Sequence, residues 1–95
     1  MCREDLYPRA ELLAKKFSEV CPEAIAQIQC LASDAFAEYG APYQVRPIAD
    51  SLSKPLKIQF LKALYTVIEA PENRDGFKAR GLRSYVAMNL SASVS

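Results

Sequence analysis

Six prolines divide this 95-residue chain into segments with helical patterns. Proline suits the first turn of a helix, where its missing N–H has no intrahelical partner, but it breaks a helix interior. Between the prolines, apolar residues recur three and four positions apart, which predicts amphipathic helices over 8–20, 22–39, 54–70 and 77–90. Strand-like alternation is short or absent. The sequence therefore predicts a single all-α domain, compact, with three to four helices and no sheet.

Residues 40–53 are predicted to be a linker, because Pro42 and Pro47 lie within six residues of each other and argue against a helix. Within it, residues 48–52 can form one short helical turn or an extended segment. Gly40 follows the last apolar residue of the second helix, the place of a left-handed helix cap. Ser53 precedes Lys54-Pro55, so it is the expected N-cap of the third helix.

The third helix is expected to lie at the centre, because its apolar stripe is the widest. Gly81 weakens the fourth helix by about 1 kcal/mol relative to alanine, and the tail 91–95 is expected to be frayed. Five alanines in the second helix predict that another helix approaches it closely. The predicted core consists of large apolar residues at helical spacing: Phe17, Ile28, Phe36, Leu61, Leu64 and Ile68.

The chain contains no histidine. This excludes Ser-His and Cys-His nucleophiles, the common zinc patterns and the usual general base at neutral pH. With only 3 glycines there is also no phosphate-binding glycine loop. Asp34 and Glu38, four residues apart, are the best candidates for a divalent cation, as in a small metal-dependent hydrolase, but such pairs are more often solvated surface charges. We expect no enzymatic activity, no metal and no cofactor.

The three cysteines, Cys2, Cys21 and Cys30, form no C-x-x-C pair and are odd in number. They are expected to be reduced thiols rather than a disulfide framework. No apolar run approaches the length of a membrane span, and the acidic start of the chain does not resemble a secretory signal. These features predict a cytoplasmic protein.

Charge is distributed unevenly along the chain. Residues 1–50 carry a net charge of −3 and residues 51–95 carry +4. No acid follows Asp75, and the last segment is predicted to present a basic surface, with an aromatic anchor, to an acidic partner protein. The predicted partner-binding residues are Arg74, Lys78, Arg80, Arg83 and Tyr85.

Two other interpretations of this segment stay open. It can be an ordinary solvated helix face, or it can contact nucleic acid as an accessory protein. The sequence pI of about 7.7 is below the values above 9 typical of nucleic-acid-binding domains, which favours the protein partner. The Ala41-Pro42 and Ala70-Pro71 bonds are candidates for cis isomers or recognition sites, although simple punctuation between helices is the favoured interpretation.

The opening sequence MCREDLYPRA, the segment Lys54-Pro55-Leu56-Lys57 and the basic end resemble a small early protein of an enteric temperate phage. Among these proteins the chain is most similar to the anti-RecBCD proteins, which protect phage DNA during recombination. The resemblance covers size and composition along the whole chain and carries no functional residue. It implies a non-enzymatic protein in the host cytoplasm that docks on the exonuclease–helicase RecBCD and inhibits or alters its activity.

Overall fold

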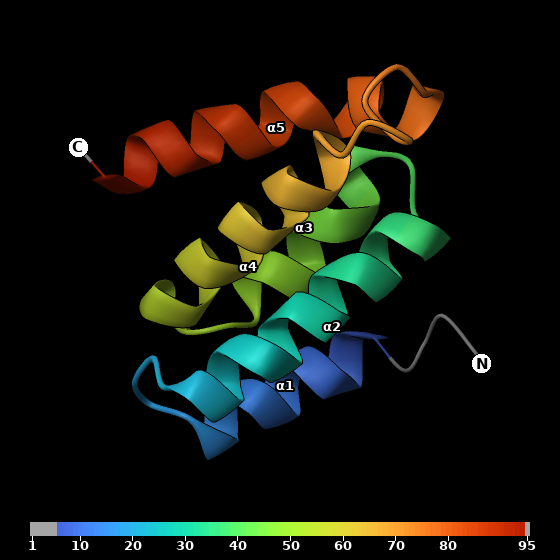
Figure 1. The fold of residues 1–95 in the computed structure, drawn as a ribbon. Coiled ribbons are helices and arrows are strands. Elements are labelled where there is room, and N and C mark those ends of the chain that lie inside the picture. Colours follow the sequence, from blue (N-terminus) through green and yellow to red (C-terminus); the bar gives the residue numbers. More distant parts are fainter. Residues whose placement is uncertain (1–5, 95) are drawn as a thin grey trace.

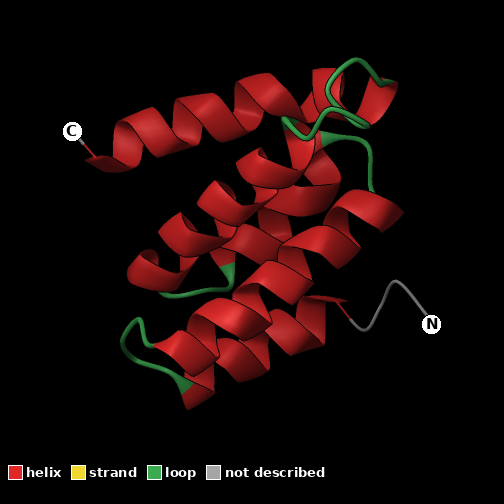
Figure 2. Ribbon diagram, viewed as in Figure 1, coloured by secondary structure: helices red, strands yellow, loops and turns green. Residues whose placement is uncertain are grey.

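The chain forms five α-helices: α1 (Leu6–Lys16), α2 (Pro22–Glu38), α3 (Pro42–Asp50), α4 (Lys54–Ile68) and α5 (Phe77–Val94). This computed structural model describes residues 6–94, with the backbone alone for Val94. Within that range there are helices and loops but no strands (Figure 2). The radius of gyration, 12.3 Å, is that of a compact domain of this length. The predicted all-α class is confirmed, but the predicted count of three to four helices is too low.

Helices α2 and α4 form the centre of the fold (Figure 1). Helix α1 packs on α2 on one side, and α5 packs on α4 on the other. Helix α3 contacts α1, α4 and α5, so it joins the two sides. The outer helices α1 and α5 each leave one face uncovered by the rest of the fold, with Leu12 and Met88 among their exposed residues.

Four of the six predicted core residues are fully buried between these helices: Ile28, Leu61, Leu64 and Ile68. Phe17 and Phe36 are only partly buried and pack against the edge of the core. The largest fully buried side chain is Phe60 of α4, which supports the central position expected for this helix.

The predicted linker contains a helix, α3, which the two prolines led us to exclude. Pro42 lies in the first turn, where the missing N–H costs nothing, and only Pro47 lies inside the helix. The Gln44 side chain accepts hydrogen bonds from the backbone N–H groups of Gly40 and Ala41, at 3.1 and 3.2 Å, and so fixes the start of α3. The helix is retained because its apolar face is fully buried: Val45, Ile48 and Ala49.

The predicted cap at Gly40 is wrong, whereas Ser53 is the N-cap residue of α4 as predicted but lacks the side-chain hydrogen bond of a cap. Gly40 has no positive φ, and α2 instead ends with Tyr39 in an extended conformation. Ser53 is at the N-cap position of α4, but its hydroxyl makes no capping hydrogen bond and is buried without a partner among residues 6–94. The end of α2 is instead held by a contact from α5.

Three helix ends also differ from the predicted ranges. Helix α1 ends at Lys16 rather than at residue 20, and α4 ends at Ile68 rather than at residue 70. Helix α5 continues through Gly81 to Val94, so residues 91–94 are helical rather than frayed. Every peptide bond from residue 6 to 94 is trans, including Ala41-Pro42 and Ala70-Pro71.

None of the described helices is both long enough and apolar enough to cross a membrane.

Candidate protein-binding surfaces

Lys78 of the predicted basic surface binds the end of another helix. Its Nζ donates hydrogen bonds to the carbonyl oxygens of Phe36, at 3.1 Å, and Ala37, at 2.6 Å. It also lies 5.8 Å from the centroid of the Phe36 ring. A cation at this position satisfies carbonyls that have no intrahelical donor and opposes the negative end of the helix dipole. Lys78 is thus a structural link between α5 and α2.

Arg83 is also engaged inside the molecule. Its Nε donates to Glu69 Oε2 at 2.6 Å, and its terminal nitrogen donates to the carbonyl oxygen of Arg74 at 2.7 Å. These bonds tie α5 to the end of α4 and to the turn that follows it. The charge of Arg83 is compensated by Glu69 and is not available in full to a partner.

Arg74 and Arg80 are the two predicted cations whose side chains remain exposed and make no polar contact with residues 6–94. Phe77, 93% exposed, lies between them in the sequence at the start of α5. The same turn carries the exposed acids Glu72 and Asp75, which offset the positive charge locally. The basic surface predicted from the sequence is therefore smaller and more mixed in charge than expected.

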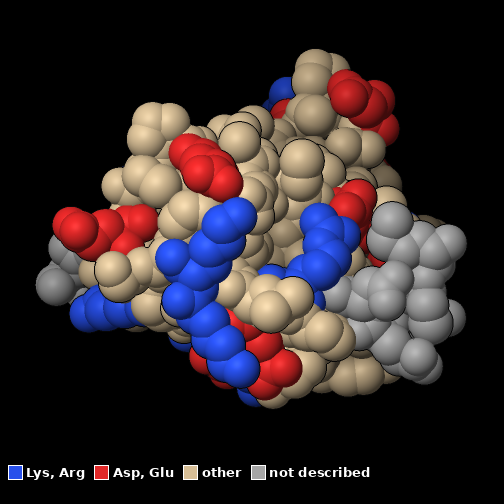
Figure 3. Space-filling view, turned by 90° about the horizontal axis from the view of Figure 1, so that it is seen from below, with Lys and Arg blue, Asp and Glu red and all other residues tan. Residues whose placement is uncertain are grey.

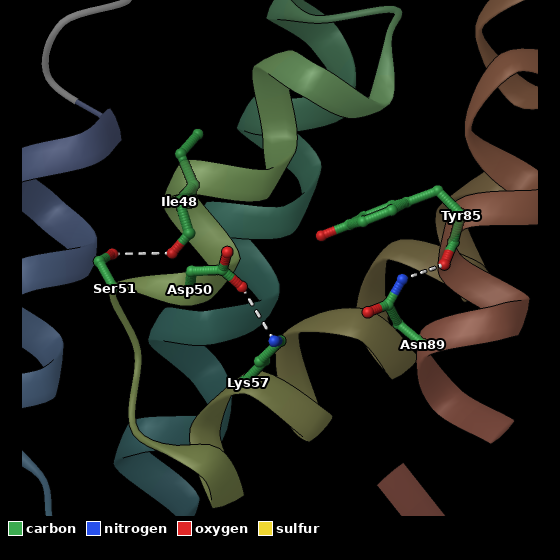
Figure 4. Close-up of polar contacts among 6 residues, drawn as sticks. All are labelled: Ile48, Asp50, Ser51, Lys57, Tyr85 and Asn89. Atoms are coloured by element: carbon green, nitrogen blue, oxygen red, sulfur yellow. Dashed lines mark hydrogen bonds and ion pairs between the residues drawn. The ribbon is translucent and has the colours of Figure 1, made fainter. Parts of the chain in front are cut away.

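Tyr85 is 8% exposed, so it is not the exposed aromatic anchor that the sequence suggested. Its ring points toward α3, where the guanidinium of Arg46 lies 5.8 Å from the ring centroid (Figure 4). Its hydroxyl is buried and has no hydrogen-bond partner within the described chain. Burial raises the pKa of Tyr85 and the charge of Asp50 raises it further, while Arg46 opposes this shift.

Asp34 and Glu38 do not form a metal site with a third ligand. Asp34 Oδ2 accepts a hydrogen bond from Arg9 at 2.7 Å, an ion pair between α2 and α1. No group of three or more potential ligands is brought together within residues 6–94. Cys21 and Cys30 are free thiols, and Cys2 lies outside the described residues.

A surface hollow lies elsewhere, in a groove between α1 and α2 of about 630 Å³. Leu12, 64% exposed, stands in it beside the buried Leu13. The α2 side is formed by Ala26, Gln27 and Cys30, of which Ala26 and Cys30 are small, exposed and one helical turn apart. The groove is therefore mainly apolar and shallow on the α2 side.

Every charged residue that lines this groove is a cation: Arg9, Lys15 and Lys16. Arg9 is paired with Asp34, and the Lys16 Nζ lies 3.2 Å from Glu23 Oε2, so each ion pair joins the two helices. Lys15 makes no polar contact with the described residues. Figure 3 shows the molecule from below, where basic side chains are separated by uncharged surface and have acidic side chains beside them.

Sequence reasoning missed this groove, although a signal was present. Leu12 and Leu13 are adjacent on α1, and neighbouring positions of a helix point about 100° apart. The apolar stripe that contains Leu13 is buried, so Leu12 lies beside it and cannot reach the core. Two adjacent leucines on a short helix thus indicate an apolar position left at the surface.

No protein-family model matches this sequence, and no curated protein and no solved structure matches it significantly.

Proposed function

We propose that this chain is a non-enzymatic protein-binding module that docks on an acidic surface of a larger protein. The observation that carries the proposal is the α1–α2 groove, an exposed apolar hollow whose charged lining residues are all cations. An apolar centre with a charged rim is the usual arrangement of a protein interface. Arg74 and Arg80 at the start of α5 are proposed as additional contacts.

The resemblance to anti-RecBCD proteins extends the proposal to a particular partner. A phage-encoded protein of this size is proposed to bind host RecBCD in the cytoplasm and to change its nuclease activity during recombination. The sequence supports a role in binding rather than in catalysis, since it lacks histidine, glycine-rich loops and a nucleophile with a base.

Purified RecBCD provides the direct test. We expect the chain to co-elute with RecBCD in size-exclusion chromatography and to change the rate at which RecBCD degrades linear duplex DNA. Exposed charges are screened beyond about 8–10 Å at physiological salt, so the association rate should fall as salt is raised. Absence of both co-elution and any change in nuclease rate would reject RecBCD as the partner.

A gel shift with random duplex DNA tests the nucleic-acid alternative. Binding to DNA weakens by about 0.9 log unit per log unit of salt for each phosphate neutralised. We expect no complex at physiological salt, because Lys78 and Arg83 are engaged within the fold. Tight binding that disappears in Arg74→Glu/Arg80→Glu would instead favour an accessory protein of nucleic acids.

A further inference from the structure

We propose that the α1–α2 groove binds one amphipathic helix of the partner, with an apolar stripe that packs on Leu12 and carboxylates that face Arg9, Lys15 and Lys16. This inference rests on the proposed protein-binding function and specifies the ligand. It is carried by the shape of the groove, by its length and by the hydrogen-bonding groups along its rim.

The shape of the groove fits a helix. Helices α1 and α2 run antiparallel side by side (Figure 1), and residues of both helices line the groove. A third helix packs in such a line with its side chains between those of the two below, at about 8–10 Å between axes. The small side chains of Ala26 and Cys30 permit this approach on α2, while Leu12 provides apolar area on α1.

The alanines of α2 show that one of its faces is already used for close helix packing. Ala24, Ala32 and Ala35 are fully buried, and α4 is the helix that α2 contacts most extensively. Ala26 lies on a different face, is exposed and lines the groove. The face with Ala26 is thus open to a helix from outside the chain.

The length of the groove agrees with a helical ligand. Its α1 residues extend from Arg9 to Lys16, seven positions, which corresponds to about 10 Å along a helix axis. Helices that bind in grooves commonly use apolar anchors at positions i, i+3 or i+4, and i+7. The first and last of these anchors are separated by the same seven positions, so the groove accommodates one set of anchors.

The rim determines the charge of the ligand. Arg9 has five N–H donors and uses one on Asp34, and Lys16 has three and uses one on Glu23. Lys15 uses none on the described residues. In the free protein these solvent-accessible donors can bind water, which glutamate or aspartate beside an apolar stripe would replace. Because Arg9 and Lys16 are already paired, Lys15 is the uncompensated charge of the rim.

The same rim disfavours a second copy of this chain as the occupant. Arg9 and Lys16 are compensated by Asp34 and Glu23, so pairing two α1–α2 faces would leave the unpaired Lys15 of each copy without an acidic residue in the other groove to receive it. The occupant is therefore a helix of different charge.

Cys30 allows the groove to be probed directly, because it is exposed and lines the groove. The background variant is Cys2→Ser/Cys21→Ser, which leaves Cys30 as the single thiol. The probe is a synthetic helical peptide of about 15 residues with leucines at i, i+4 and i+7 and glutamates beside them. A matched peptide carries lysine in place of every glutamate.

We expect the acidic peptide at saturation to slow alkylation of Cys30 at least about tenfold, and the basic peptide to leave the rate unchanged. Leu12→Asp and Lys15→Glu should each weaken the acidic peptide by about tenfold or more. Lys62→Glu, an equal charge reversal at an exposed position of α4, is the matched control and should not weaken it.

Several outcomes would overturn the inference. They are an unchanged Cys30 rate at saturating acidic peptide, equal protection by the basic peptide, and a dimer that dissociates in Leu12→Asp. Protection by phosphatidylglycerol vesicles without protection by the peptide would point to a lipid surface instead.

Measurements of RecBCD activity distinguish a failure of the groove inference from a failure of the proposed function. If wild type and Leu12→Asp change RecBCD activity equally, the binding function stands and the groove inference fails. If the acidic peptide binds through Leu12 but RecBCD is unaffected by the wild-type chain, the groove inference stands and the proposed partner fails.

Discussion

Gly81 of α5 lies so close to Gly40 that a Cβ at position 81 would be 2.9 Å from the Gly40 carbonyl oxygen. That oxygen belongs to the backbone that connects α2 and α3, so it cannot move aside as a flexible side chain does. Helix α5 therefore passes this connection at a distance that only glycine permits. Glycine has a low helix propensity, and this close approach gives a physical reason for its presence at position 81.

The variant Gly81→Ala tests this close approach. In an open helix the change would add about 1 kcal/mol of stability, but here we expect overpacking to lower the free energy of unfolding by about 1–3 kcal/mol. Urea denaturation followed by circular dichroism measures the difference. Gly40→Ala is the control, because its Cβ would meet only the Lys78 side chain at 3.4 Å. A more stable Gly81→Ala protein would contradict the packing described.

Lys78→Met should destabilise the protein by about 1–2 kcal/mol, because it removes a charged donor from the Phe36 and Ala37 carbonyls while keeping most of the apolar stem. Arg80→Met, two positions further along the same helix, removes an equal charge that makes no polar contact with the described residues and should change stability by less than about 0.5 kcal/mol. Thermal unfolding of the two variants compares them directly. Equal effects would mean that the contact of Lys78 with α2 contributes nothing.

Leu64→Ala should lower the free energy of unfolding by about 2–5 kcal/mol, since Leu64 is fully buried in the centre of α4. Leu12→Ala deletes the same atoms from an exposed site and should cost less than about 0.5 kcal/mol. Chemical denaturation of both proteins makes the comparison. A denaturation midpoint for Leu64→Ala equal to that of wild type would show that Leu64 is not part of the core.

Tyr85 should make the fold less stable in strong base. Burial, with a contribution from Asp50, raises the pKa of Tyr85 in the folded protein above its value of about 10 in the unfolded chain. The folded state then holds its proton more tightly, so this contribution to stability is complete below pH 10 and is lost as the pH rises through the folded pKa.

Tyr85→Phe removes this titration and also the buried hydroxyl that has no partner in the described chain. We expect it to be at least as stable as wild type at pH 7 and to lose less stability above pH 10. Urea midpoints from pH 7 to pH 11 measure both effects, and the difference between the two proteins cancels other groups that titrate. Parallel decline of the two proteins in base would show that Tyr85 is not the responsible group.

The sequence was informative about helices whose apolar stripe is long. The start of α2 at Pro22, the start of α4 at Lys54 and the start of α5 at Phe77 agree with the predicted ranges. In each case a turn residue or proline precedes a stripe that tertiary packing can use, so local and global preferences coincide. Helix α3 was missed because nine residues with two prolines carry little local signal, and burial of Val45 and Ile48 retains the helix.

The candidate surfaces were harder to predict because charge in a sequence does not show where each charge is used. In the sequence, Lys78, Arg80 and Arg83 are all cations of one predicted helix, and nothing distinguishes them as engaged or free. In the structure, Lys78 binds the carbonyls of residues 36–37 and Arg83 binds Glu69. The sequence predicted Tyr85 to be exposed because it did not predict α3, whose Arg46 lies over the Tyr85 ring. These assignments depend on contacts between segments distant in the chain.

The link between Lys78 and the end of α2 spans 41 residues of chain. The ribosome makes the chain from its N-terminus, so α1 and α2 are synthesised before α5. The α1–α2 hairpin can assemble from neighbouring residues early, but the last turn of α2 receives its donor only when α5 has emerged. The contacts between α1 and α2 are thus local along the chain, whereas the last turn of α2 is completed only by the final helix to be synthesised.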